Sequence, residues 1–146
     1  MKQRHKVISA AMVVLERDGK IFLIKRANTG WRDGQYDLIA GHVEKNERVA
    51  DAAIREAHEE AGIRIQKDDL ELVHVLSLVR NDGDAEYFYF RALKWEGEPI
   101  ANEKQKSDGY GWYDSDETRN IEVLPVVAHA LKQIHEKNLY SEGVFA

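Results

Sequence analysis

The fold of this chain is decided by residues 41–63, which begin Gly41-His42-Val43-Glu44-Lys45-Asn46-Glu47 and end Arg55-Glu56-Ala57-His58-Glu59-Glu60-Ala61-Gly62-Ile63. The second half predicts a helix, because small and aliphatic residues recur at steps of three and four. At about 100° per residue, these residues form one narrow apolar stripe. Asn46 is the expected N-cap of this helix, and Gly62 is the expected left-handed C-cap. The stripe consists of Ala50, Ala53, Ile54, Ala57 and Ala61.

Three glutamates, Glu56, Glu59 and Glu60, project from a different face of this helix. Their i, i+3, i+4 spacing makes them neighbours, and like charges so placed repel one another. Such a cluster suits a hard divalent cation, which takes oxygen ligands and offsets their negative charge. The alternative is a solvated helix face. Its ordinary i,i+4 ion pairs would be Asp51–Arg55, Arg55–Glu59 and Glu60–Arg64.

The whole stretch resembles the Nudix box, a motif with fixed gaps. The motif is a glycine, five residues, a glutamate, seven residues, Arg-Glu, an aliphatic residue, any residue, Glu-Glu, any residue, a glycine and an aliphatic residue. The resemblance implies a Nudix (MutT-like) hydrolase with an α/β fold, in which a mixed β-sheet lies between helices as an α/β/α sandwich. The fixed places are filled by Gly41, Glu47, Arg55, Glu56, Ala57, Glu59, Glu60, Gly62 and Ile63.

The composition limits the classes of protein to consider. With 146 residues, the chain has room for one core, so residues 1–146 are expected to form a single Nudix hydrolase domain. The absence of cysteine excludes disulfides and suits a reducing cytoplasm. No apolar run approaches the roughly 20 residues of a membrane span, so no membrane partner is expected. The net charge of -5 is not offset by a basic tract, which argues against nucleic acid as a partner.

The remaining elements follow from local patterns. Residues 7–15 and 20–25 predict a hairpin across Asp18-Gly19, and residues 36–40 predict a short strand that leads into Gly41. Residues 70–80 and 85–95 predict a long hairpin. The second strand of this hairpin carries aromatic residues on both faces, so we expect it inside the sheet and covered on each side.

The last third of the chain predicts one more strand and a closing helix. The strand is expected to begin at Trp112-Tyr113, and the helix opens near Pro125. His74 is expected to pack within its strand, whereas His129 and His135 are expected to face solvent. The residues that the closing helix is expected to bury are Val127, Ala130, Leu131 and Ile134.

The resemblance assigns roles to residues of the site. Glu56, Glu59 and Glu60 would bind Mg²⁺ or Mn²⁺, together with the backbone carbonyl of Ala40. A later loop would add a fourth acidic ligand, for which Glu103 is favoured over the nearby Glu96 and Glu98. Arg55 would pair with Glu47 and fix the loop against the helix, as its planar guanidinium with five donors allows. Either Glu56 or Glu103 would serve as the general base.

Three more residues are candidates for contacting the substrate. Arg26 ends its predicted strand, where it is either a surface cation or a ligand of substrate phosphate or base. Trp31 in the following loop either covers the edge of the core or stacks on a nucleobase. Asp37, in the strand before Gly41, is the third candidate for substrate binding.

The function implied by the resemblance is hydrolysis of a nucleoside diphosphate linked to another group. The small size and layout favour (deoxy)nucleoside triphosphates, cleaved to monophosphate and pyrophosphate. Two alternatives stay open: an ADP-ribose or nucleotide-sugar pyrophosphatase, and a Nudix-fold sensor that binds a nucleotide without hydrolysing it. Dimers are common in the family, so a homodimer is compatible with the resemblance.

Overall fold

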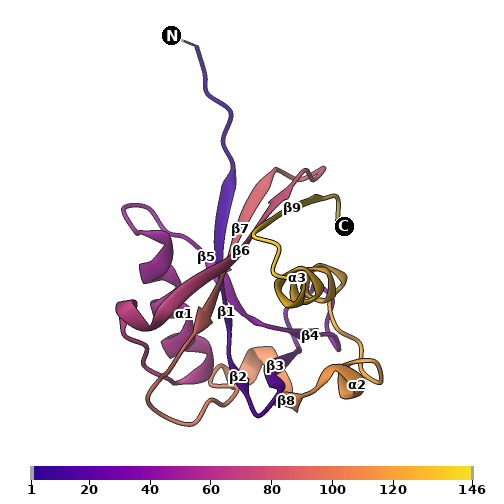
Figure 1. Ribbon diagram of the computed structural model, residues 1–146. Coiled ribbons are helices and arrows are strands. Elements are labelled where there is room, and N and C mark those ends of the chain that lie inside the picture. The colour runs from indigo at the N-terminus through magenta and orange to yellow at the C-terminus, as the bar shows by residue number, and fades with distance from the viewer. Residues whose placement is uncertain (1, 146) are drawn as a thin grey trace.

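The computed structural model describes residues 2–145, which form two β-sheets and three α-helices (Figure 1). The strands are β1 (Ile8–Val14), β2 (Glu16–Arg17), β3 (Lys20–Arg26), β4 (Tyr36–Asp37), β5 (Ile39–His42), β6 (Leu70–Leu78), β7 (Ala85–Ala92), β8 (Ser107–Tyr113) and β9 (Tyr140–Gly143). The helices are α1 (Val49–Ala61), α2 (Ser115–Thr118) and α3 (Pro125–His135), with 3₁₀ turns η1 (Lys67–Asp69) and η2 (Lys104–Lys106).

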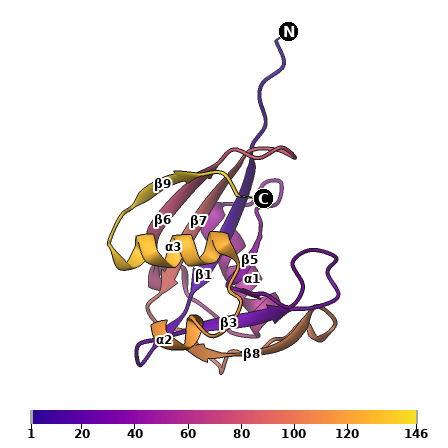
Figure 2. The ribbon, with the colours of Figure 1, turned by 90° about the vertical axis from the view of Figure 1, so that its right-hand side faces the viewer.

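The larger sheet is a mixed sheet in the order β5-β1-β7-β6-β9. Strands β1 and β7 run parallel, as do β6 and β9, whereas the β1–β5 and β6–β7 pairs are antiparallel. Helix α1 covers one face and α3 the other, with α3 lying across the sheet in Figure 2.

Alternate residues of β1 face the two helices: Met12 and Val14 pack on the α3 side, and Ala11 and Val13 on the α1 side. The α/β sandwich predicted from the sequence is confirmed.

The smaller, four-stranded sheet joins β2, β3, β4 and β8, and it is a feature that the sequence did not predict. The hairpin across Asp18 and Gly19 joins β2 to β3, so β1 lies in the larger sheet and does not pair with the next long strand. The predicted strand at residues 36–40 is also divided between the two sheets, and it breaks at Leu38. Asp37 pairs with Ile24 in the smaller sheet, and Ile39 pairs with Val13 in the larger one.

Helix α1 is confirmed, but its N-cap and its buried face differ from the prediction. The N-cap is Arg48 rather than Asn46, which instead lies in the preceding loop with a positive φ of 64°. The buried face includes Ala52, which the predicted stripe omitted. Gly62 is the left-handed C-cap that the sequence predicted, with φ of 69° and its N–H directed at carbonyls of the last turn.

The hairpin of β6 and β7 is confirmed, and β7 lies inside the sheet between β1 and β6. His74 packs within β6 as expected: it is fully buried, and its ring nitrogens lie 2.6 Å from the carbonyl oxygen of Asn138 and 2.7 Å from Ser141 Oγ. His129 was wrongly expected to face solvent, because its Nε2 lies 3.0 Å from the same Ser141 hydroxyl.

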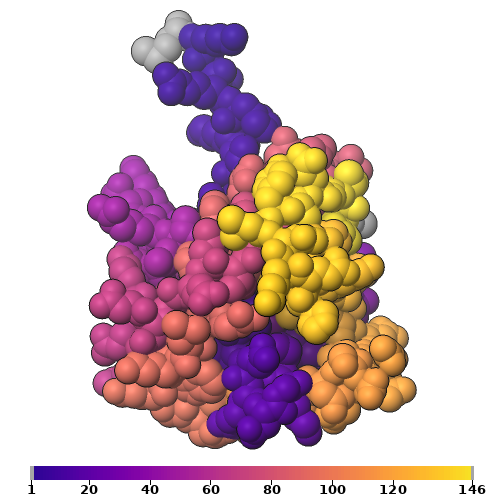
Figure 3. Space-filling view, in the orientation of Figure 1, coloured from indigo at the N-terminus to yellow at the C-terminus, as the bar shows by residue number. Residues whose placement is uncertain are grey.

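Two corrections concern the end of the chain. Strand β8 ends at Tyr113 rather than beginning there, and residues 140–143, which gave no signal in the sequence, form the edge strand β9. Helix α3 buries Val127, Ala130 and Ile134 as predicted, whereas Leu131, which was also expected in the core, is only partly buried. The N-terminal residues 2–7 stand away from the body of the molecule (Figure 3). Within residues 2–145, no helix is long and apolar enough to cross a membrane.

Candidate active site

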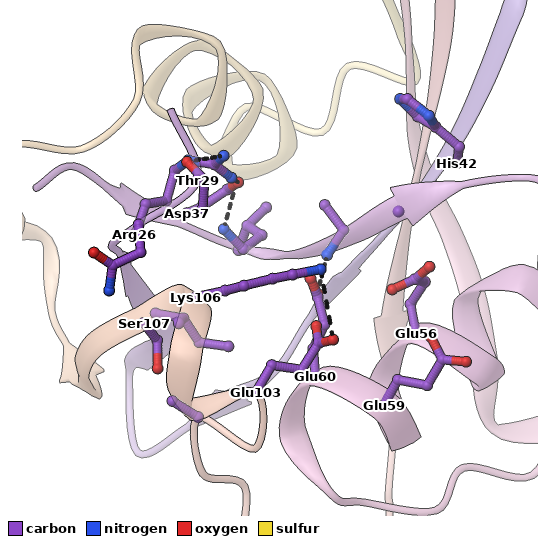
Figure 4. Close-up of a pocket in the computed structure, with 16 residues that line it drawn as sticks. Arg26, Thr29, Asp37, His42, Glu56, Glu59, Glu60, Glu103, Lys106 and Ser107 are labelled. Carbon is purple, nitrogen blue, oxygen red and sulfur yellow. Dashed lines mark hydrogen bonds and ion pairs between the residues drawn. The ribbon is translucent and has the colours of Figure 1, made fainter. Parts of the chain in front are cut away.

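A cavity of about 600 Å³ opens between α1, β5, the end of β3 and the loop before β8 (Figure 4). Most of the residues that line it are polar or charged, and five of them are acidic. A nucleotide-sized ligand fits a cavity of this volume. The charged residues lining the cavity are Arg26, Asp37, Glu56, Glu59, Glu60, Glu103 and Lys106.

Glu60 is the acidic residue held most tightly in the cavity. Its carboxylate accepts a 2.8 Å hydrogen bond from the backbone N–H of Ala40, which joins α1 to β5. Burial raises the pKa of Glu60 well above its usual range, against the effect of that N–H, and the neighbouring charges of Glu56, Asp37 and Glu103 raise it further. A buried carboxylate that folding alone would disfavour is typical of a functional site.

Glu56 lies against the backbone of Gly41, and this contact explains the glycine that opens the motif. A Cβ atom at position 41 would stand 2.0 Å from the Glu56 carboxyl carbon, so a side chain at that position cannot coexist with this placement of Glu56. Burial raises the pKa of Glu56, while a hydrogen bond from Arg55 acts in the opposite direction. The backbone of β5 and the carboxylates of α1 are therefore in direct contact.

Arg55 holds the loop before α1 against the helix, as the sequence predicted. Its Nε and Nη2 donate to the two carboxylate oxygens of Glu47 at 2.8 and 3.0 Å, and Nη2 also donates to the carbonyl of His42 at 3.1 Å. The Arg55 hydrogen bonds, together with the Glu44 N–H, lower the pKa of Glu47 to about 2. On the cavity side, Nη1 of Arg55 donates to Glu56 at 2.7 Å and to Glu59 at 3.2 Å.

The ion pairs expected of a merely solvated helix face form only in part. Arg55 pairs with Glu59, but Asp51 pairs with Lys67 of η1 at 2.9 Å. Glu60 turns into the cavity toward Ala40 instead of pairing along the helix surface. Ion pairs within α1 therefore do not account for the positions of these glutamates, and Glu60 lies in the cavity instead.

Glu103 lies beside the carboxylates of α1 because the loop that carries it is fastened to the end of that helix. The backbone N–H of Asn102 donates to the carbonyl of Glu60 at 2.7 Å, and its side-chain amide donates to the carbonyl of Glu59 at 3.1 Å. Asn102 thus satisfies two carbonyls of the last turn of α1 and places the next residue at the cavity. The sequence gave no signal for this role of Asn102.

The donor set fits a hard divalent cation. Four carboxylates and the backbone of Ala40 line one cavity, and oxygen ligands are those that Mg²⁺ and Mn²⁺ prefer. Over residues 2–145, no three acidic or histidine side chains already stand in the arrangement of a metal site. The carboxylates of Glu56 and Glu59 instead accept hydrogen bonds from Arg55, and that of Glu60 accepts one from the Ala40 N–H.

The other end of the cavity is formed by Arg26 and Asp37, two of the predicted substrate-binding residues. Arg26 donates to the carbonyl of Trp31 at 3.0 Å, to Thr29 Oγ1 at 2.9 Å and to Asp37 at 3.4 Å. Burial raises the pKa of Asp37 to about 6, although the charge of Arg26 opposes that shift. Both residues are thus held in place at the wall of the cavity.

Trp31 is not brought into the cavity with them. The Arg26 guanidinium lies 4.9 Å from the centroid of the Trp31 ring, and 46% of Trp31 is exposed. Among the described residues, those that line the cavity include Thr29 and Asn28 of the same loop, but not Trp31. Lys106 and Ser107 also line it, and sequence reasoning missed both, since each is an ordinary polar residue in a polar loop.

The fold and this site together define a hydrolase of the Nudix family. The NUDIX domain profile matches residues 5–136, and the chain therefore belongs to that family, whose members act on pyrophosphate bonds of nucleotides and generally use divalent metal ions. The crystal structure of a MutT NUDIX hydrolase from Burkholderia pseudomallei is similar to this chain with a TM-score of 0.79 and 27% identity, covering 88% of this chain and 98% of that one.

Similar sequences bear names with different substrates. The uncharacterized Nudix hydrolase YvcI of Bacillus subtilis (strain 168) is 29% identical over 123 residues, which are 81% of this chain and 73% of that protein. The NAD-capped RNA hydrolase NudC of Chromobacterium violaceum is 28% identical over 85% of this chain and 44% of its own length. The CTP pyrophosphohydrolase of Escherichia coli (strain K12) is 38% identical over 40% of this chain and 43% of its own length. Kinship therefore shows the class of reaction and not the substrate.

Proposed function

We propose that this chain acts as one Nudix domain in the cytoplasm and hydrolyses (deoxy)nucleoside triphosphates to the monophosphate and pyrophosphate. The observation that carries the proposal is the division of the cavity into two ends. One end gathers Glu56, Glu59, Glu60 and Glu103, and the other is formed by Arg26 and Asp37. A metal-bound polyphosphate suits the acidic end, and the hydrogen-bonding groups of a base or sugar suit the other.

The acidic end needs a counter-charge before it can receive a phosphate chain. Mg²⁺ or Mn²⁺, held by the four glutamates and the Ala40 carbonyl, would neutralise phosphate charge and lower the pKa of the attacking water. Arg55 keeps the loop and α1 together, so that Glu47 and Glu56 stay in place. The Ala40 N–H holds Glu60 at the floor of the cavity. The protein thereby fixes the geometry in which water meets phosphorus.

The general base is one of two residues, Glu56 or Glu103. Burial raises the pKa of Glu56, which brings its proton affinity closer to that of a base working near neutral pH. Single variants Glu56→Gln and Glu103→Gln separate the two roles. The base variant loses kcat, by about 10²–10⁴-fold, while it keeps most of its Mn²⁺ affinity. The variant of a pure metal ligand loses Mn²⁺ affinity first.

The size and the fixed wall of the cavity are compatible with a nucleoside triphosphate. The cavity is compact at about 600 Å³, and Arg26 is already occupied by Trp31, Thr29 and Asp37, so it serves as a fixed wall. Similar sequences include both a CTP pyrophosphohydrolase and an ADP-ribose pyrophosphatase, so the panel assay decides between the two substrate classes.

The experiment is a panel assay of the purified protein with Mg²⁺. It compares the common NTPs and dNTPs with ADP-ribose, nucleotide sugars and dinucleoside polyphosphates, and it separates the products. Monophosphate plus pyrophosphate from a triphosphate is the expected result. AMP plus a sugar phosphate would instead assign the protein to the ADP-ribose or nucleotide-sugar branch. Nucleotide binding without turnover would make it a sensor.

A further inference from the structure

Among the cationic side chains that line the cavity in the described part of the chain, Lys106 is held only weakly. Of the described lining residues, Arg26 and Lys106 carry a full positive charge, and Arg26 is bound by three partners. Lys106 has a single long ion pair, from its Nζ to a carboxylate oxygen of Glu103 at 3.9 Å, and its side chain is 65% exposed. An exposed pair at that distance is weak, so the ammonium group is available to another anion.

The backbone of Lys106 is fixed even though its ammonium group is not. The Lys106 N–H donates to the carbonyl of Glu103 at 2.9 Å, and its carbonyl accepts from the N–H of Ala27 at 2.9 Å. The next residue, Ser107, pairs with Arg26 in the smaller sheet. Figure 4 shows the side chain extending from this anchored turn across the cavity toward Glu60 and Glu103.

The balance of charge at this end of the cavity favours such a movable cation. Glu56, Glu59, Glu60 and Glu103 all line this end of the cavity. A polyphosphate would add further negative charge. If the Lys106 ammonium group moved from Glu103 to a phosphate, it would stabilise the bound phosphate. The same movement would leave the Glu103 carboxylate free to bind a metal ion.

We propose that Lys106 is a phosphate-binding residue that exchanges Glu103 for the phosphate of the substrate, which frees the Glu103 carboxylate to bind the divalent cation. This inference rests on the proposed function of the same cavity. It makes Lys106 a competitor of the metal in the empty protein and a ligand of the substrate in the complex.

The exchange predicts that removing the charge of Lys106 raises the affinity for Mn²⁺ and lowers the affinity for pyrophosphate. Lys106→Met keeps the length of the side chain and removes its charge. Without nucleotide, the variant binds Mn²⁺ about two- to fivefold more tightly, because an exposed ion pair no longer competes for Glu103. With Mn²⁺ saturating, it binds inorganic pyrophosphate about tenfold more weakly, because one charge-assisted contact to phosphate is lost.

The matched control is Lys104→Met. Lys104 lies in the same 3₁₀ turn, two residues away, and it is exposed but is not among the described residues that line the cavity. This variant loses the same charge and is expected to match the wild-type protein in both measurements. In a Glu103→Gln background, Lys106→Met is expected to leave Mn²⁺ affinity unchanged, because the competition has been removed.

Mn²⁺ binding by electron paramagnetic resonance and pyrophosphate binding by calorimetry test the proposal without turnover. Opposite shifts in Lys106→Met, absent from Lys104→Met, are the expected result. Equal behaviour of the two variants, or a loss of both affinities in Lys106→Met with an unchanged melting temperature, would overturn it. The wild-type panel assay is scored separately, so absence of turnover there rejects the proposed function without deciding the role of Lys106.

Discussion

Removing the charge of Glu47 tests whether the Arg55 clamp stabilises the fold. The pKa of Glu47 falls from an ordinary 4.5 to about 2, chiefly through the hydrogen bonds from Arg55. Linkage converts that difference to an upper bound of about 3 kcal/mol at neutral pH. The pair is partly exposed, with 22% of the Arg55 side chain and 15% of the Glu47 side chain accessible. Solvent screening therefore reduces the expected loss for Glu47→Gln to about 1–2 kcal/mol.

The pH dependence gives the sign of the effect. The folded-state pKa of Glu47 is lowered, so its stabilisation is complete above the ordinary pKa and is lost as pH falls from about 4.5 toward 2. The free energies of unfolding of the wild-type protein and Glu47→Gln, measured by urea titration at several pH values, should differ at pH 7. More than half of that difference should be gone by about pH 3.

The control for this prediction is another bidentate Arg–Glu pair of the same chain. Arg17 donates to both oxygens of Glu98 at 3.0 and 2.7 Å, but these side chains are 41% and 65% exposed. Glu98→Gln should therefore change stability little. Equal losses in the two variants, or a loss in Glu47→Gln that does not depend on pH, would refute the reasoning.

Two further predictions concern the walls of the cavity. Gly41→Ala should displace the Glu56 carboxylate, because the new Cβ would stand 2.0 Å from the Glu56 carboxyl carbon. We expect kcat to fall at least about tenfold with little change in melting temperature. Activity and thermal unfolding, measured on the same variant, check this prediction. Asp37→Asn should stabilise the protein by about 1–3 kcal/mol at pH 7.5. Burial raises the pKa of Asp37 to about 6, so the wild-type protein loses stability as pH rises from about 4 to 6, and the neutral asparagine avoids that loss. That gain should vanish below about pH 4 in urea titrations, and a gain that is the same at every pH would contradict it.

Local spacing predicted those parts of the site that a short segment determines by itself. The helix at residues 49–61, its C-cap Gly62 and its clustered glutamates follow from repeats of three and four residues. The pairing of Arg55 with Glu47 was implied by the resemblance and is present in the structure. The roles of these residues in binding a metal remain predictions.

Contacts between distant segments could not be predicted from such patterns. Asn102 fastens the Glu103 loop to α1 through carbonyls that any helix end presents, so its own sequence carries no signal. The division at Leu38 depends on which partner each half of the segment meets, because Asp37 pairs in one sheet and Ile39 in the other. Strand β9 exists because β6 offers a free edge, a property of the assembled sheet rather than of residues 140–143.

The central claim is that the glutamates of α1 bind a divalent metal for hydrolysis, and Glu60→Gln tests it most directly. Glutamine can still accept the Ala40 N–H, and it replaces a carboxylate whose pKa burial raises with a neutral amide. The measurement is Mn²⁺ affinity, nucleotide turnover and melting temperature for this variant beside Glu71→Gln, an exposed control in β6. The account predicts weakened Mn²⁺ binding, a loss of turnover of at least about 100-fold and an equal or higher melting temperature for Glu60→Gln alone. Unchanged Mn²⁺ binding and turnover would contradict the metal site.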